Sequence, residues 1–235
     1  MQKDEVMKLL ENLGSEQTKN TLLRHGAKEP FFGVKVGDMK HIQKKIKKDY
    51  PLSLELFATG NGDAQYLAGL IADETKMSKK DLTGWAKNAR WQMISEYTVA
   101  WIAAESTHGW ELAHEWIESK NEQVASSGWA TLANLVAIQS DALLDIKKLE
   151  ALMKLVATKI HTSPDRIKYT MNSFIISTGC YVAALSDTAK KITKEIGVVT
   201  INIGDTACKV PDATACINKV IAMGKLGKKK KEARC

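Results

Sequence analysis

Residues 121–138 read Asn-Glu-Gln-Val-Ala-Ser-Ser-Gly-Trp-Ala-Thr-Leu-Ala-Asn-Leu-Val-Ala-Ile, and this stretch decides the fold class. Its apolar residues recur at intervals of three and four, which is the spacing of one face of an α-helix. A polar strip runs along the same stretch, with Gln123, Ser127, Thr131 and Asn134 at positions i, i+4, i+8 and i+11. Residues at these offsets share one helix face. The stretch therefore predicts one long helix with a polar stripe.

The same periodicity continues in both directions, so the chain is a succession of helices. Starts are marked by Asp, Ser, Thr or Pro, and stops by Gly or Asn. The predicted helices cover residues 2–12, 16–25, 38–48, 51–59, 63–73, 78–88, 90–105, 108–119, 121–138, 145–161, 164–185, 187–196 and 212–223. Residues 198–203 are β-branched and predict a short strand or extended loop. The predicted fold class is all-α.

Neighbouring predicted helices form pairs joined by short links. Pairs start near residues 38, 78, 107, 145 and 187, and intervals of roughly 30–40 residues are close to the period of two-helix repeats. Stacked pairs form a right-handed α-solenoid with one concave face, and an irregular helical bundle is the alternative. We expect one domain of helical repeats over residues 1–224. A flexible basic tail without an apolar face would follow over residues 225–235.

Composition excludes several classes of protein. The chain has 235 residues, of which 44% are hydrophobic and 26% charged, as in globular domains with a sizeable core. Residues 1–12 are amphipathic and charged, unlike a signal peptide, and no apolar run reaches the length of about 18 residues that spans a membrane. We therefore expect a cytoplasmic monomer without a membrane partner. The four cysteines form no C-x-x-C pair, so we expect no metal and no cofactor.

Positive charge is concentrated in two segments. Residues 225–235 contain six basic residues and one acidic residue, a net of +5, and residues 35–48 have the same balance. The whole chain carries +7, so the remainder carries −3. A polyanion would therefore be attracted to the two segments and not to the whole surface.

All six tryptophans lie between positions 85 and 129. Packing in the core is the simplest interpretation for most of them, whereas one or two that faced a groove would stack on bases. Two further polar strips lie on predicted helices, one over residues 92–96 and one formed by Arg166, Thr170, Ser173 and Ser177. These strips either line the concave groove or allow helices to pack closely, and both interpretations stay open.

Four short segments carry a resemblance to a known family. They are Phe31–Asp38, the tryptophan-containing helix 90–105, Asn121–Val124 and Arg166–Tyr169. The first is the most specific, because Phe-Gly-Val at 32–34 leads into a lysine-rich helix. Over most of its length the chain resembles the bacterial DNA alkylation repair family of the AlkD type, which is built from HEAT-like repeats. The resemblance implies an α-solenoid that holds DNA in its concave groove.

Active members of that family carry a W-x-x-x-D motif beside the sugar of an N-alkylated purine. The carboxylate stabilises the positive charge that develops as the glycosidic bond breaks. The resemblance places the indole at Trp91, but the carboxylate position is Ser95. Glu96 lies about 100° further around an α-helix, and Glu105 follows Trp101 by four residues. The catalytic candidates are therefore Trp91, Ser95, Glu96 and Glu105, and the resemblance implies reduced or absent base excision.

The leading hypothesis is a DNA-binding protein of this family that holds duplex, damaged or branched DNA mainly by its phosphates. The residues expected to contact DNA are Lys35, Lys40, Lys44, Lys45, Lys47, Lys48, Gln123, Ser127, Arg166, Lys168 and Ser173. One alternative is a glycosylase that releases cationic N3- or N7-alkylpurines. The other is a protein–protein scaffold, which the net charge of −3 outside the two basic segments would suit.

Overall fold

The computed structural model describes residues 1–202 and 209–234, and it confirms the all-α prediction. Its α-helices are α1 (Lys3–Leu13), α2 (Glu16–Arg24), α3 (Val36–Ile46), α4 (Tyr50–Ala58), α5 (Gly62–Ile71), α6 (Lys79–Asn88), α7 (Ala100–Glu105), α8 (Gly109–Ile117), α9 (Glu122–Ile138), α10 (Ile146–Lys159), α11 (Asp165–Tyr181), α12 (Ser186–Ile196) and α13 (Ala213–Ala222). A π-helix, Ile94–Val99, leads directly into α7, and short 3-10 turns cover Asp141–Leu143, Ile160–Thr162 and Ala183–Leu185.

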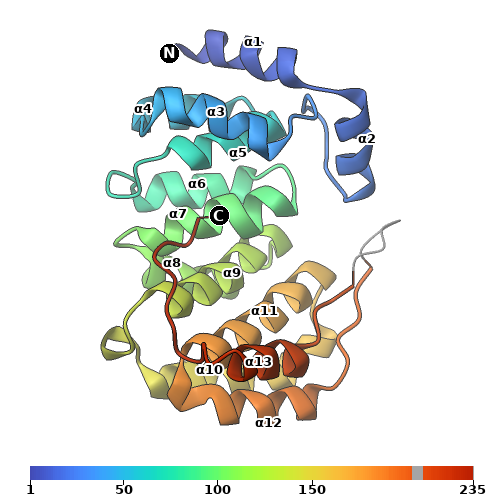
Figure 1. The fold of residues 1–235 in the computed structure, drawn as a ribbon, viewed down its shortest axis with the longest axis vertical. Helices are drawn as coiled ribbons and strands as arrows, with labels where there is room; N and C mark the ends of the chain where they lie inside the picture. The colour runs from blue at the N-terminus through green and yellow to red at the C-terminus, as the bar shows by residue number, and fades with distance from the viewer. Residues whose placement is uncertain (203–208, 235) are drawn as a thin grey trace.

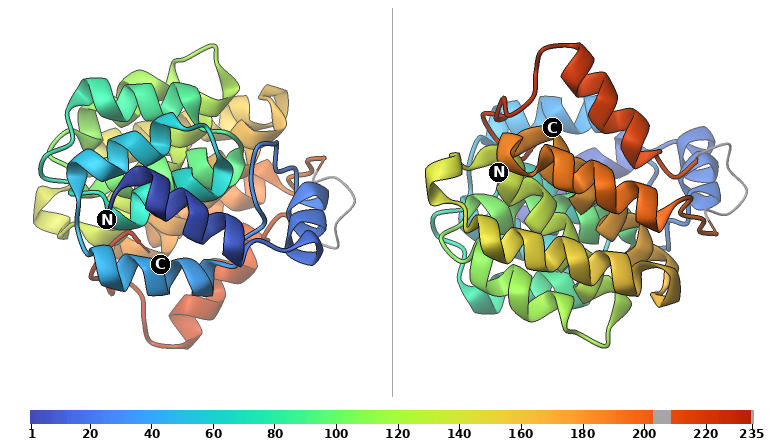
Figure 2. Two further views of the ribbon diagram at one scale, coloured as in Figure 1. Left: turned by 90° about the horizontal axis from the view of Figure 1, so that it is seen from above. Right: turned by 90° about the horizontal axis from the view of Figure 1, so that it is seen from below.

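The helices stack in chain order from α1 to α12, as a solenoid of helix pairs (Figure 1). Helices α5, α7, α9 and α11 form successive layers of the core, and α9 packs against α7, α8 and α11. At the far end of the stack α10, α12 and α13 lie side by side (Figure 2). No helix within the described residues is long and apolar enough to cross a lipid bilayer.

Helix α9 shows why the small polar residues of its stripe are there. The Asn121 side chain accepts the N–H groups of Gln123 and Val124 and so caps the helix. Further along, Ser127 and Thr131 are fully buried, and each hydroxyl donates to a carbonyl of its own helix. A Cβ atom at Gly128 would lie 2.8 Å from the Ile117 nitrogen of α8. The stripe beyond Gln123 therefore serves close helix packing and does not line a groove.

The loop Phe31–Val34 is fixed by one buried carboxylate. The N–H groups of Phe32, Gly33 and Val34 donate to Asp63, at 2.6, 2.9 and 3.4 Å. Burial raises the pKa of Asp63, and the three amides oppose that shift. Gly33 has φ +80°, and a Cβ atom there would lie 2.6 Å from the Lys19 nitrogen. This loop therefore docks α2 onto the start of α5.

The basic segment 225–234 lies against the body of the protein, so the prediction of a flexible tail is wrong. It donates hydrogen bonds to the last turns of successive core helices. Gly227 N–H bonds to the Cys180 carbonyl at 2.9 Å, Lys230 N–H to Ala137 at 2.8 Å, and Lys229 Nζ to Val136 at 2.8 Å. Cations and donors are stabilised at helix C-termini, where carbonyl groups lack helical partners.

The end of this segment is held by an ion-pair cluster. Arg234 Nε bonds to the Glu105 carboxylate at 2.9 Å, and its Nη2 pairs with Glu74. Its Nη1 donates to the Ala72 carbonyl at the end of α5, at 3.3 Å. Ala233 beside it is 2% exposed. The sequence carried no apolar pattern that would reveal this contact, because the bonds go to backbone carbonyls and to two acids far away in the chain.

The predicted strand over residues 198–203 is absent from the part that the structure describes. Residues 197–202 form neither helix nor strand, and residue 203 lies outside the described residues. Asn202 N–H donates to Asp165 at 2.9 Å, so this loop is attached to the start of α11.

We expect Arg234→Ala to lower the free energy of unfolding by about 2 kcal/mol, because it leaves two largely buried carboxylates without their partner. Lys231→Ala is the matched control, since Lys231 is exposed on the same segment. Urea denaturation would measure both. Equal stability of the two variants would show that the segment does not support the core helices.

We expect Asp63→Asn to destabilise the protein by about 2–3 kcal/mol, because three amide donors lose a charged acceptor. Asp4→Asn, at a position exposed on α1, should change stability by less than about 0.5 kcal/mol. Thermal unfolding of both variants tests this, and a small effect at Asp63 would contradict the assigned role of its carboxylate.

Candidate nucleic-acid interface

A cleft of about 330 Å³ lies where the core helices begin. It is lined by Lys28, Arg90, Trp91, Gln92, Ser95, Glu96, Asn121, Glu122, Gln123, Ser126 and Arg166. These residues come from the loop after α2, from residues 90–96 before and at the start of the π-helix, and from the first turns of α9 and α11. The first amides of helices have no helical partner and carry partial positive charge, so anions are favoured at such ends.

Trp91 is the only one of the six tryptophans that lines this cleft. It is half-buried, and its Nε1 lies 3.7 Å from the Cβ position of Gly62 at the start of α5. Trp85, Trp101, Trp116 and Trp129 are at most 4% exposed and pack in the core, and Trp110 donates to Gln139 at 2.7 Å. Core packing therefore accounts for most of the tryptophans, and Trp91 remains the candidate for contact with a ligand.

The π-helix brings Glu96 to the same cleft as Trp91. A π-helix has i to i+5 hydrogen bonds and a wider turn than an α-helix, and Ser95 and Glu96 both belong to the π-helix that follows Trp91. Glu96 and Ser95 both line the cleft. The expected offset of about 100° between Ser95 and Glu96 therefore does not keep Glu96 out of the cleft. The sequence shows no feature that predicts a π-helix here.

Both oxygens of Glu96 are bound by one guanidinium. Arg166 Nε donates to Oε1 at 2.7 Å, and Nη2 pairs with Oε2. The Glu96 side chain is 3% exposed and that of Arg166 is 24% exposed. Burial raises the pKa of the Glu96 carboxyl, and Arg166 opposes this shift. The bidentate pair closes the floor of the cleft and neutralises its buried charge.

Other contacts hold Arg166 in place. Its guanidinium carbon lies 4.6 Å from the centre of the Tyr169 ring, and its backbone N–H donates to Glu122 at 2.9 Å. Tyr97 is close by, and burial, helped by Tyr169, raises the pKa of Tyr97 to about 12. Arg166 was expected to bind DNA, but its guanidinium group is already bonded to the Glu96 carboxylate. Both acids that line the cleft are therefore bonded to this one residue.

Side-chain amides join the walls of the cleft. Gln92 donates to the His25 carbonyl after α2, and Gln123 donates to the Ala89 carbonyl after α6. Arg90 Nε donates to the Gly60 carbonyl before α5 at 3.0 Å. Lys28 is exposed at the rim. Lys28 and Arg90 are therefore the cations available to an incoming anion at this face.

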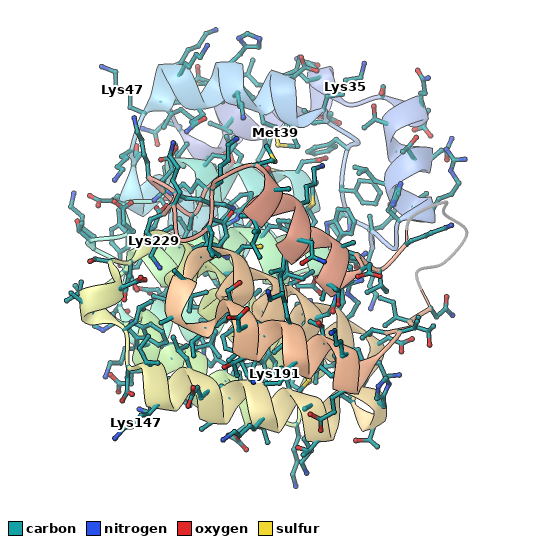
Figure 3. All side chains as sticks on the ribbon, turned by 60° about the horizontal axis from the view of Figure 1, so that its bottom comes forward. Lys35, Met39, Lys47, Lys147, Lys191 and Lys229 are labelled. Atoms are coloured by element: carbon teal, nitrogen blue, oxygen red, sulfur yellow. The ribbon has the colours of Figure 1, made fainter. Side chains whose placement is uncertain are left out.

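The lysines predicted for DNA contact on α3 do not gather at the cleft. Lys35 and Lys47 lie at opposite ends of α3 (Figure 3). Lys48 pairs with Glu74 at 2.5 Å, next to Arg234 and the end of α5. The exposed Lys44 and Lys45 belong to the last turn of α3, at the same end as Lys47, and Lys40 lies between the two ends. Charge density along the sequence predicted a basic helix, but not that none of its lysines lines the cleft.

The remaining predicted contacts are placed as follows. Ser127 is fully buried, and its hydroxyl donates to Gln123, so it is inaccessible to DNA. Ser173 is half-buried and bonds to its own helix, and Lys168 pairs with Asp165 at 3.2 Å. Glu105 contacts the C-terminal segment and does not line the cleft.

Sequence reasoning missed Lys28 and Arg90. The available signals were their positions, since Arg90 directly precedes Trp91 and Lys28 lies just before the Phe31–Asp38 segment. Within the described residues, no group of three or more His, Cys, Asp or Glu side chains is arranged to hold a metal ion. Cys208 and Cys235 lie outside the described residues.

Comparisons with known proteins show the family and the fold of the chain. A family model described as "DNA alkylation repair enzyme" matches residues 6–193. The uncharacterized proteins Lin0241 of Listeria innocua and Lmo0209 of Listeria monocytogenes are each 30% identical over 222 residues, which is 92% of this chain and 96% of each relative. A solved structure described as "a new family of proteins related to the HEAT-like repeat DNA glycosylases with affinity for branched DNA structures" superposes with a TM-score of 0.92. That structure has 38% identity, and both chains are covered completely. This chain therefore belongs to the DNA alkylation repair enzyme family.

Proposed function

We propose that the protein binds branched or deformed DNA at the Trp91 cleft and does not excise bases. The Glu96–Arg166 pair is the observation that supports the absence of base excision. Arg166 occupies both oxygens of the buried carboxylate beside Trp91. Binding to branched DNA is supported by the solved relative, whose family is described as having affinity for branched DNA.

Base excision needs negative charge near the sugar as the glycosidic bond breaks. A preorganised group of this kind typically contributes about 10²–10³ in rate. Glu96 is positioned beside Trp91, but its charge is balanced by a guanidinium at hydrogen-bond distance. A cationic sugar would therefore meet a neutral pair. The position one turn after Trp91 is Ser95, whose hydroxyl bears no charge.

DNA binding at this face is supported by the available donors. Lys28 and Arg90 lie on the rim, and the N-terminal ends of α9 and α11, where the helix dipole is positive, line the cleft. Phosphate contacts of this kind give affinity without reading sequence. An indole such as that of Trp91 suits an unstacked base, and such bases are common at branch points.

We also propose that the protein acts in the cytoplasm as a monomer.

We expect Lys28→Gln to weaken binding to a four-way junction by about three- to tenfold. The salt slope, which is the slope of the logarithm of the binding constant against the logarithm of salt concentration, should fall in magnitude by about 1. Fluorescence anisotropy over a salt series measures both quantities. Lys147→Gln on the outer helix α10 removes the same charge away from the cleft and is the matched control. If the two variants bind equally well, DNA does not reach the cleft rim.

We expect no release of 3-methyladenine or 7-methylguanine from methylated duplex, either by the wild-type protein or by Glu96→Gln. Chromatography of the released bases is the measurement. Release by the wild-type protein that disappears in Glu96→Gln would identify Glu96 as a catalytic residue and would favour the glycosylase alternative.

A further inference from the structure

The two basic segments of the sequence meet on one face of the molecule. Lys48, just after α3, and Arg234, near the end of the chain, both pair with Glu74. The turn after α3 is fixed at this place, because Asp49 N–H donates to the Ile71 carbonyl at 2.8 Å. The C-terminal end of α3 and the segment 225–234 each supply three exposed lysines to this side. We call them the rear lysine face, and they are Lys44, Lys45, Lys47, Lys228, Lys230 and Lys231.

Two of the acids on this face are already neutralised, whereas Glu232 is exposed and forms no ion pair with another described residue. Glu74 pairs with both Lys48 and Arg234, and Glu105 pairs with Arg234 at 2.9 Å. By contrast, none of the six lysines of the rear lysine face forms an ion pair with another described residue. The face therefore presents six lysines without ion pairs and one carboxylate, a net positive charge that attracts polyanions.

Lys47 adds an independent observation. Its φ is +64° with ψ −134°, which is a conformation that favours glycine and strains other residues. Lys47 is the only non-glycine residue with positive φ in the described part of the chain. Strained backbone of this kind is found most often where the side chain has a function. A lysine at this turn carries its charge outward at the junction of the two basic segments.

The rear lysine face and the cleft lie at opposite ends of the core helices. In α9, Gln123 lines the cleft, whereas the Ala137 carbonyl accepts the N–H of Lys230. Fourteen residues of α-helix span about 20 Å, which is close to the width of a duplex. A ligand at one face therefore leaves the other face free.

We propose that the rear lysine face is a second duplex-binding surface, so that one molecule holds one DNA arm in the cleft and another arm at the rear. The occupant is double-stranded DNA, bound by its phosphates. This inference rests on the proposed function, because the first arm occupies the cleft described above. It gives a physical reason for a preference for DNA that has more than one arm.

The test compares three variants with the wild-type protein. The rear variant is Lys44→Gln, Lys45→Gln, Lys228→Gln and Lys231→Gln. The control variant removes four lysines of α10, namely Lys147→Gln, Lys148→Gln, Lys154→Gln and Lys159→Gln. The cleft variant is Lys28→Gln with Trp91→Ala. Short duplexes labelled with either a donor or an acceptor dye report bridging by energy transfer, and anisotropy over a salt series reports the binding of single duplexes.

We expect the wild-type protein and the control variant to bridge two duplexes, and excess protein to abolish the bridging. The rear variant should lose bridging, and the magnitude of its salt slope should fall by about 3.6, since each of the four lost phosphate contacts removes about 0.9. The cleft variant should also lose bridging while still binding one duplex. Lys47→Gly should raise the melting temperature and yet reduce the magnitude of the slope by about 1, a combination that unfolding cannot produce.

Several outcomes would overturn the inference. If the rear variant behaves like the control variant, or if the cleft variant loses all duplex binding, the rear lysine face does not hold DNA, and the proposed function is unaffected. Binding of the rear face to phosphatidylserine vesicles but not to duplex would also overturn it. If instead duplex binding survives in the cleft variant and is lost in the rear variant, the rear lysine face holds duplex, but the proposed role of the cleft fails and the two-arm arrangement fails with it.

Discussion

The backbone polarity of the core helices is the constraint on which the rest of the structure depends. Each helix leaves unpaired N–H groups at its first turn and unpaired carbonyls at its last turn. The starts of α9 and α11 lie together at the cleft, and the ends of α5, α9 and α11 lie together at the segment 225–234. One end of the stack is therefore suited to anions. The other end requires donors and cations, which the basic segment provides.

This polarity explains how one charge-rich sequence yields two different environments. The segment 225–234 uses backbone amides, Lys229 and Arg234 to satisfy carbonyls and acids of the body. Its other lysines remain exposed. At the cleft, by contrast, the buried positive charge of Arg166 is matched by Glu96. Each end thus combines cations that are bound within the protein with cations that remain exposed, such as Lys28 at the cleft, and the exposed cations underlie both proposals.

Most of the fold followed from the sequence, because helix periodicity and capping are local properties. The helix 121–138 is observed as α9 at Glu122–Ile138, with Asn121 as its cap. The errors arose where long-range contacts decide the structure. The bonds of Arg234 join residues more than 120 positions apart, and the pairing of Glu96 with Arg166 spans 70 positions. The π-helix that turns Glu96 toward Trp91 likewise left no pattern in residues 90–105.

The segment 225–234 also changes how the molecule can unfold. In a solenoid each repeat contacts only its neighbours, so the ends of the stack can open independently of the middle. Here Arg234 bonds to Ala72 across 162 positions, and the same segment bonds to α9 and α11 on the way. The segment couples layers that share no direct contact. Opening any one layer from α5 to α11 therefore disturbs the bonds of the others, and these layers behave as one cooperative unit and not as a chain of independent repeats.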